Sequence, residues 1–120
     1  MDARSLFRDA LLPIYDALSV RVNALDSGVI EEFKKTQVSY GLARKFIWLP
    51  PLSNRTALLT IDTWHEHHDT MLRDVIRYRI DKFTHQVVVR TASDIDEVDR
   101  RGWLAQAAAW GRRERPGDEA

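Results

Sequence analysis

The sequence predicts a single α+β domain with an N-terminal helix, about five mostly antiparallel strands and a C-terminal helix, with both helices on one face of the sheet. Apolar residues recur at helical spacing near both ends of the chain and alternate with polar residues in between. A chain of 120 residues with 44% hydrophobic and 30% charged residues has the size and composition of one globular domain. We therefore expect one domain over residues 1–110.

The N-terminal helix is indicated by an apolar stripe with helical spacing. Its members are Phe7, Leu11, Ile14, Leu18, Val22 and Leu25. Pro13 has no amide hydrogen and clashes with the preceding turn, so it either begins the main helix or separates a short leading turn around residues 5–11. We favour the break. The turn-forming residues of "NALDSG" end this helix.

The first strands follow Val29, where the hydrophobic period changes from about 3.6 residues to about 2. The alternating segment "VSYGL" (38–42) and the apolar run "FIWLP" (46–50) are joined by "ARK", which predicts a hairpin. Pro50 and Pro51 end the second strand, because neither can donate a backbone hydrogen bond.

The remaining strands begin with "ALLTID" (57–62). One of its faces carries Ala57, Leu59 and Ile61, and the other carries Leu58, Thr60 and Asp62. The segments "VIRYRI" and "FTHQVVVR" flank a turn at "DK" and predict a second hairpin. In its second strand, the residues expected to face the core are Phe83, His85, Val87 and Val89.

The C-terminal helix is predicted to begin near Ser93, which precedes Asp96 by three positions and resembles a helix cap. Its apolar stripe consists of Ile95, Val98, Gly102, Ala105 and Ala109. We expect Trp103 in the core, and Trp110 either in the core or in a partner-binding patch. The segment 111–120, "GRRERPGDEA", has no apolar anchor and is expected to be a disordered tail.

Composition excludes several classes of function. The 18 basic and 18 acidic residues cancel, so the chain lacks the overall field that attracts nucleic acid or anionic membranes. The absence of cysteine excludes disulfides, thiolate zinc sites and a cysteine nucleophile. The first 25 residues carry charges throughout and lack the apolar run of a secretory signal or membrane span. We expect a cytoplasmic protein that does not bind membranes.

Three segments, in this order, resemble the bacterial family known as domain of unknown function 5655 (DUF 5655). They are "KKTQVSYGLARKFIWLP", "DKFTHQVVV" and "SDIDEVDRRGWLAQAAAW", and the resemblance extends from about Val29 to Trp110. It implies a small α+β domain, found alone or fused to others, with no established reaction. The histidine-rich segment of the present chain belongs to no motif of that family.

The segment "HEHHD" (65–69) holds three of the four histidines and suggests a metal site. If the preceding strand continued through it, His65 and His67 would share a face and Asp69 could join them as a ligand. A metal-dependent protein or enzyme using His65, His67 and His68 is therefore an alternative. The favoured interpretation is a solvated polar loop between two strands, without a metal.

A second alternative is binding of single-stranded nucleic acid by the first hairpin. Aromatic and basic residues of this region are Tyr40, Phe46, Trp48, Trp64, Lys34, Lys35, Arg44, Lys45 and Arg55. Rings that stack on bases beside cations that meet phosphates would suit that function. Such residues are also ordinary components of a sheet, and we expect no nucleic-acid partner.

The favoured prediction is a non-catalytic module that binds a small molecule or a protein partner. The sequence contains no recognisable phosphate loop, dinucleotide fingerprint or catalytic triad, so we expect no cofactor and no catalytic residue. His85 is the candidate of most interest, because its phase places an imidazole in the core. The predicted ligand-binding residues are Lys35, Gln37, Tyr40, Trp48 and His85.

Overall fold

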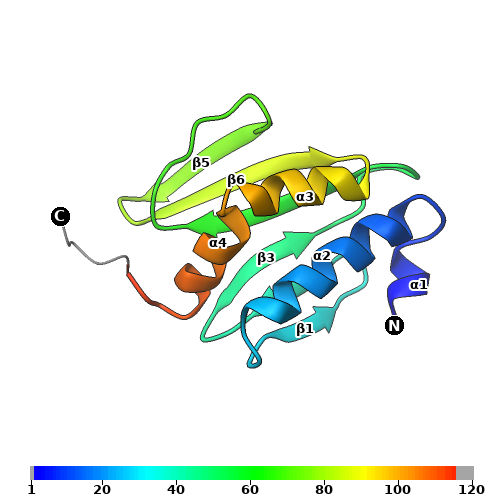
Figure 1. The fold of residues 1–120 in the computed structure, drawn as a ribbon, viewed down its shortest axis with the longest axis horizontal. Helices are drawn as coiled ribbons and strands as arrows, with labels where there is room; N and C mark the ends of the chain where they lie inside the picture. The colour runs from blue at the N-terminus through cyan, green and yellow to red at the C-terminus, as the bar shows by residue number, and fades with distance from the viewer. Residues whose placement is uncertain (1, 116–120) are drawn as a thin grey trace.

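The computed structural model describes residues 2–115, and these form a layer of helices against one antiparallel sheet (Figure 1). The helices within this range are α1 (Ala3–Leu6), α2 (Leu11–Leu25), α3 (Ala92–Arg100) and α4 (Trp103–Gly111). The strands are β1 (Ile30–Phe33), β2 (Val38–Gly41), β3 (Lys45–Leu49), β4 (Ala57–Thr63), β5 (Asp74–Arg79) and β6 (Lys82–Val89). The predicted α+β class is confirmed. Part of the predicted tail, residues 116–120, lies outside the described residues.

The sheet has the strand order β1-β2-β3-β4-β6-β5, and every neighbouring pair is antiparallel. Both predicted hairpins are present, as β2 with β3 and β5 with β6. The centre is the long pairing of β4 with β6, in which Ile61 lies opposite His85 and Asp62 opposite Thr84. Because side chains alternate along each strand, the first pair faces one side of the sheet and the second pair faces the other.

The described residues contain six strands rather than about five, and the additional strand is β1. Its sequence, "IEEF", shows no clear alternation of apolar and polar residues, which is why it was not predicted. The Glu31 side chain of β1 lies on the side of the sheet that faces the helices. Its carboxylate accepts hydrogen bonds from the Tyr15 hydroxyl at 2.9 Å and the Ser19 hydroxyl at 2.7 Å, both on α2.

Of the predicted N-terminal stripe, Phe7, Leu11, Ile14, Leu18 and Val22 are buried, although Phe7 precedes α2, and Leu25 is half-buried. Tyr15 of α2 is buried as well. The favoured break at Pro13 is wrong in position: the chain breaks between Leu6 and Leu11, and Pro13 lies at the beginning of the main helix, which was the other alternative. The main helix starts at Leu11, so Pro13 lies in its first turn, where the missing amide hydrogen costs least.

The prediction of one C-terminal helix is wrong. The chain forms α3 and α4, separated at Gly102, whose φ of +79° is a left-handed conformation that favours glycine. The cap of α3 is Thr91 rather than Ser93. The Thr91 side chain accepts from the Asp94 backbone, and the Asp94 carboxylate accepts from the Thr91 backbone at 3.2 Å, which forms a reciprocal capping box.

The helices pack on one face of the sheet, and α2, α3 and α4 lie in front of it in Figure 1. An irregularity between β2 and β3 pairs Tyr40 with Ile47 and Gly41 with Lys45, which leaves Phe46 as an extra residue. Phe46 is fully buried against Gly111 of α4, where an added Cβ would lie 2.4 Å from the phenyl ring. Trp103 and Trp110 are both buried, so Trp110 belongs to the core.

The opposite face of the sheet carries Leu58, Thr60 and Asp62 of β4, as predicted, and we call it the uncovered face. In the register of the strands, one row across it consists of Glu32, Ser39, Trp48, Thr60, Gln86 and Asp74. Among residues 2–115, no helix has the length and apolar character needed to cross a membrane.

Candidate ligand site

The first candidate site lies on the helix side, where the loop of residues 64–73 follows β4 and meets α4. A hollow of about 290 Å³ opens there, and it is lined by Trp64, His65, Gln106 and Ala109. We call it the seam hollow. Its volume is close to the lower end of the range of roughly 300–1,000 Å³ that is usual for small-molecule pockets.

Next to the seam hollow, Arg44 lies between the indole rings of Trp64 and Trp110. The Arg44 guanidinium carbon lies 3.3 Å from the ring centroid of Trp110 and 5.2 Å from that of Trp64. Its Nε donates to the Trp110 carbonyl at 2.8 Å, and its backbone amide donates to the Gly111 carbonyl at 3.1 Å. Burial lowers the pKa of Arg44, and the charges of neighbouring arginines lower it further. The guanidinium is therefore fixed in position while Nη2 stays buried and unpartnered within the described residues.

Trp64 stands between this arginine and the hollow. Its ring centroid is 6.4 Å from that of Trp110, and its Nε1 is buried with no hydrogen-bond partner among residues 2–115. The Thr63 hydroxyl donates to the His65 carbonyl at 2.7 Å, which holds the chain in a turn directly after β4. Trp64 is therefore presented by a constrained turn.

Two further histidines, neither of which lines the hollow, pack against each other near Gln106. The backbone amide of His67 donates to Nε2 of His85 at 3.0 Å, and the two ring centroids are 5.1 Å apart. Because Nε2 accepts, the neutral His85 ring carries its proton on Nδ1. Burial, followed by the neighbouring His67, lowers the pKa of His85 to about 4. Burial also lowers the pKa of His67, whose ring lies beside the Gln106 side chain of the seam hollow.

Unpartnered polar atoms are concentrated in this region. In the part of the chain that the structure describes, six buried side-chain polar atoms have no hydrogen-bond partner, and four of them belong to Arg44, Trp64, His67 and His85. A buried polar group without a partner costs about 1–3 kcal/mol, so such groups are rare unless something else meets them. The Arg44 and Trp64 atoms are hydrogen-bond donors, whereas the Nδ1–H of His85 points toward the backbone carbonyls of Ile61 and Phe83. The arrangement therefore suits a ligand that supplies acceptors.

A second hollow of about 240 Å³ lies on the uncovered face. Its lining residues are Trp48, Thr60, Asp62, Tyr78, Lys82 and Thr84. The Asp62 side chain is only 2% exposed, and the Thr84 hydroxyl donates to its Oδ1. Lys82 Nζ lies 4.0 Å from Oδ2. Burial raises the pKa of Asp62, which the Thr84 hydrogen bond and the Lys82 charge oppose.

The predicted ligand-binding residues do not form one site. Lys35 and Gln37 lie in the turn between β1 and β2, and Tyr40 is fully buried on the helix side. Trp48 lies on the uncovered face, since the neighbouring Ile47 pairs with Tyr40 and faces the helices. His85 is buried on the helix side, in agreement with its predicted phase. Trp48 therefore lines the second hollow, on the uncovered face, whereas His85 lies on the opposite side of the sheet.

The segment "HEHHD" forms a loop, as predicted. His65 and His68 are exposed, and His67 packs against His85. Asp69 accepts from Arg101 at 2.9 Å instead of approaching the histidines. Within residues 2–115, no group of three histidine, cysteine, aspartate or glutamate side chains is placed to hold a metal ion.

The aromatic and basic residues of the first hairpin are likewise distributed. Tyr40 and Phe46 are fully buried. Lys34 and Lys45 both pair with Glu32, at 3.2 and 2.6 Å. Two of the four aromatic rings are therefore buried away from a nucleic-acid strand, and two of the five basic side chains are already paired with a carboxylate.

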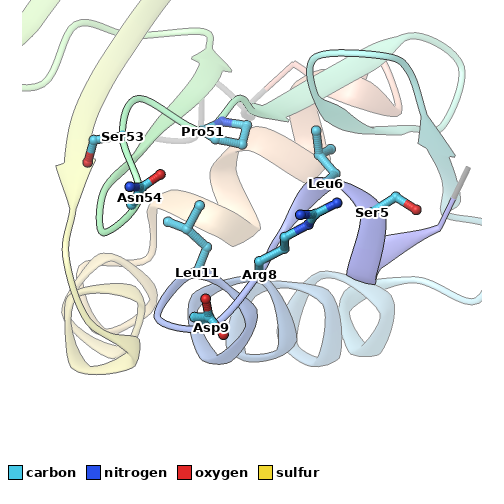
Figure 2. A pocket seen from close by; sticks show the side chains of 8 residues that line it. All are labelled: Ser5, Leu6, Arg8, Asp9, Leu11, Pro51, Ser53 and Asn54. Atoms are coloured by element: carbon cyan, nitrogen blue, oxygen red, sulfur yellow. The ribbon is translucent and has the colours of Figure 1, made fainter.

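A larger hollow of about 470 Å³ lies between the α1–α2 segment and the loop after β3 (Figure 2). Its polar lining residues are Ser5, Arg8, Asp9, Ser53 and Asn54, all of them exposed. None of the described residues there presents a buried polar group to the hollow, so it has fewer features of a binding site than the two hollows above.

Comparison with known proteins identifies the family. A family model described as "Domain of unknown function (DUF5655)" matches residues 3–108. The chain belongs to this family. No curated protein and no solved structure matches the DUF5655 chain.

Proposed function

We propose that this DUF5655 chain is a non-catalytic binding module, and that the seam hollow takes a small molecule with a flat apolar body and a carboxylate or similar acceptor group. The observation that carries the proposal is the buried, unpartnered indole N–H of Trp64, which lines the hollow, with the unpartnered Nη2 of Arg44 beside the same ring. Apolar walls with a few convergent polar groups are the usual composition of ligand pockets.

The acceptor group is inferred from the donors. Arg44 Nη2 and Trp64 Nε1 can only donate hydrogen bonds, and neither has a partner among the described residues. A carboxylate accepts at both oxygens and would also be attracted by the Arg44 charge. The flat apolar body is inferred from the indole ring of Trp64 and the methyl group of Ala109.

A binding role without catalysis is supported by the spacing of the titratable groups. His85 Nε2 is engaged by the His67 backbone, and the buried carboxylate of Asp62 lies on the opposite face of the sheet. These groups cannot act on one substrate as a paired acid and base. The bacterial and cytoplasmic character expected from the family resemblance and the cysteine-free composition is part of the same proposal.

The experiment is a thermal-shift and calorimetric comparison of indole-3-acetate, benzoate and uncharged indole. We expect the two carboxylates to stabilise the protein and indole to bind more weakly, because indole lacks the acceptor group. A ligand at 100 times its Kd adds about 2.7 kcal/mol to the free energy of unfolding.

The matched variants are Ala109→Leu, which fills the seam hollow, and Ala105→Leu, at an exposed position of the same helix. We expect only the first to abolish binding. Equal stabilisation of both variants by indole-3-acetate, or no stabilisation of the wild type by either carboxylate, would rule out this hollow as the ligand site.

A further inference from the structure

Asp62 is a buried carboxylate on the face of the sheet that faces away from the helices. Burial of a charge is costly unless it is paired, and the side chain is only 2% exposed. Thr84 meets Oδ1. Within the described residues, Oδ2 accepts no hydrogen bond, and Lys82 Nζ at 4.0 Å is beyond hydrogen-bond distance. An open acceptor therefore lies in the hollow.

The surroundings of this oxygen combine three kinds of group. Trp48 of β3 and Tyr78 of β5 are aromatic, and Thr60 lies opposite Trp48 in the register. The Lys82 ammonium is 5.0 Å from the Tyr78 ring centroid, and it brings donors to the same hollow. The hollow thus offers an acceptor, a cationic donor, hydroxyl groups and an aromatic surface.

These groups favour a neutral ligand. Lys82 and Asp62 carry opposite charges 4.0 Å apart, so their fields largely cancel and the hollow has no net attraction for an added cation or anion. A neutral ligand that both donates and accepts hydrogen bonds can satisfy the two together, as hydroxyl groups do. The volume of about 240 Å³ exceeds the roughly 150 Å³ cavity that holds benzene, so it accommodates one six-membered ring with substituents.

We infer that the hollow around Asp62 binds one ring of a neutral saccharide. The C–H face of the sugar lies on Trp48, because ring faces are electron-rich and sugar C–H groups are weakly positive. Its hydroxyl groups donate to Asp62 Oδ2 and accept from Lys82. This site is separate from the seam hollow and does not depend on the function proposed for it.

The same face is poorly suited to a nucleic-acid strand. The row that contains Trp48 has acidic residues, Glu32 and Asp74, at its two ends. Lys45 already pairs with Glu32 at 2.6 Å. A strand lying across the sheet would meet carboxylates where its phosphates require cations.

The test is an NMR titration of the full chain with the methyl glycosides of glucose, galactose and mannose and with N-acetylglucosamine. A short oligouridylate is titrated in parallel. We expect at least one sugar to shift the amides of Thr60 and Thr84 and the indole signal of Trp48 saturably. The oligouridylate should leave them unchanged.

The variants are Asp62→Asn and Lys82→Met, with Asp74→Asn as the control, an exposed carboxylate on the same face. Each of the first two should weaken sugar binding about tenfold or more, because each removes a hydrogen bond to a charged group. The control should bind like the wild type, and unchanged amide spectra should verify folding of each variant.

Three results would overturn the inference: no shift with any sugar, equal affinity in wild type and both variants, or shifts at these residues with the oligouridylate alone. If Asp62→Asn does not fold, the Lys82→Met titration decides between these outcomes.

Discussion

The backbone amide of His67 donates a 3.0 Å hydrogen bond to Nε2 of His85, which connects the histidine-rich loop to the interior strand β6 of the sheet. The bond requires a neutral His85, since a protonated ring has no acceptor nitrogen. Its consequences for stability can be measured by changing the pH.

The first prediction concerns acid sensitivity. The pKa of His85 falls from 6.5 to about 4 on folding, so the unfolded state binds more protons between these values. The contribution of His85 is complete above pH 6.5 and is lost as the pH falls toward about 4. Urea unfolding at pH 7 and pH 5 should show wild type losing about 2 kcal/mol more than His85→Gln, which retains an acceptor.

The control variant is His68→Gln, which replaces an exposed loop histidine. Its loss of unfolding free energy between pH 7 and pH 5 should match that of the wild type. If His85→Gln and the wild type lose the same free energy between the two pH values, then His85 is not the buried neutral histidine described above.

The second prediction concerns metals. His65 is exposed, His67 packs against His85, and Asp69 pairs with Arg101. We therefore expect the chelated protein and protein dialysed against trace zinc to melt at the same temperature. Retention of stoichiometric zinc after chelation, with a higher melting temperature that His65→Gln abolishes, would establish the metal site instead.

The third prediction concerns Glu31, which accepts from Tyr15 and Ser19. Glu31→Ala leaves two part-buried hydroxyls without their acceptor and should lower the free energy of unfolding by about 1–3 kcal/mol. The neighbouring Glu32 forms exposed ion pairs with Lys34 and Lys45, which solvent screens, so Glu32→Ala should cost less than Glu31→Ala. Equal losses in chemical denaturation would contradict the roles assigned to the two acids.

The fourth prediction concerns Gly111. A methyl group there would lie 2.4 Å from the Phe46 ring, so Gly111→Ala should cost about 1–3 kcal/mol by overpacking. Adding Phe46→Leu should recover part of that loss, which a double-mutant cycle measures as a coupling between the sites. Strictly additive losses would show that the two residues do not meet.

Much of the sheet could be predicted because alternation along a strand follows directly from backbone geometry. The faces of residues 57–62 and the burial of His85 were predicted from that pattern. The break at Gly102 was missed because the helical spacing of apolar residues continues across it, while the left-handed φ is invisible in the pattern. β1 was missed because its sequence does not alternate and its Glu31 is stabilised by α2, a contact that only the tertiary fold creates.

The candidate sites were harder to predict than the fold. Arg44 and Trp110 are separated by 66 positions, and only the packing of α4 on β3 and β4 brings them together. Asp62 was assigned to the correct face, but its burial depends on Trp48 and the β5–β6 hairpin around it. Tyr40 and Trp48 were grouped because they are close in sequence, although strand pairing directs them to opposite faces.

The most direct test of the proposed ligand site is the NMR signal of the Trp64 indole N–H during titration with indole-3-acetate. That N–H is buried and unpartnered within residues 2–115. The account predicts a saturable downfield shift of this signal as the carboxylate accepts its hydrogen, no such shift in Ala109→Leu, and an unchanged Trp48 indole. An unchanged Trp64 signal at saturating ligand, or the same shift in Ala109→Leu, would contradict binding in the seam hollow.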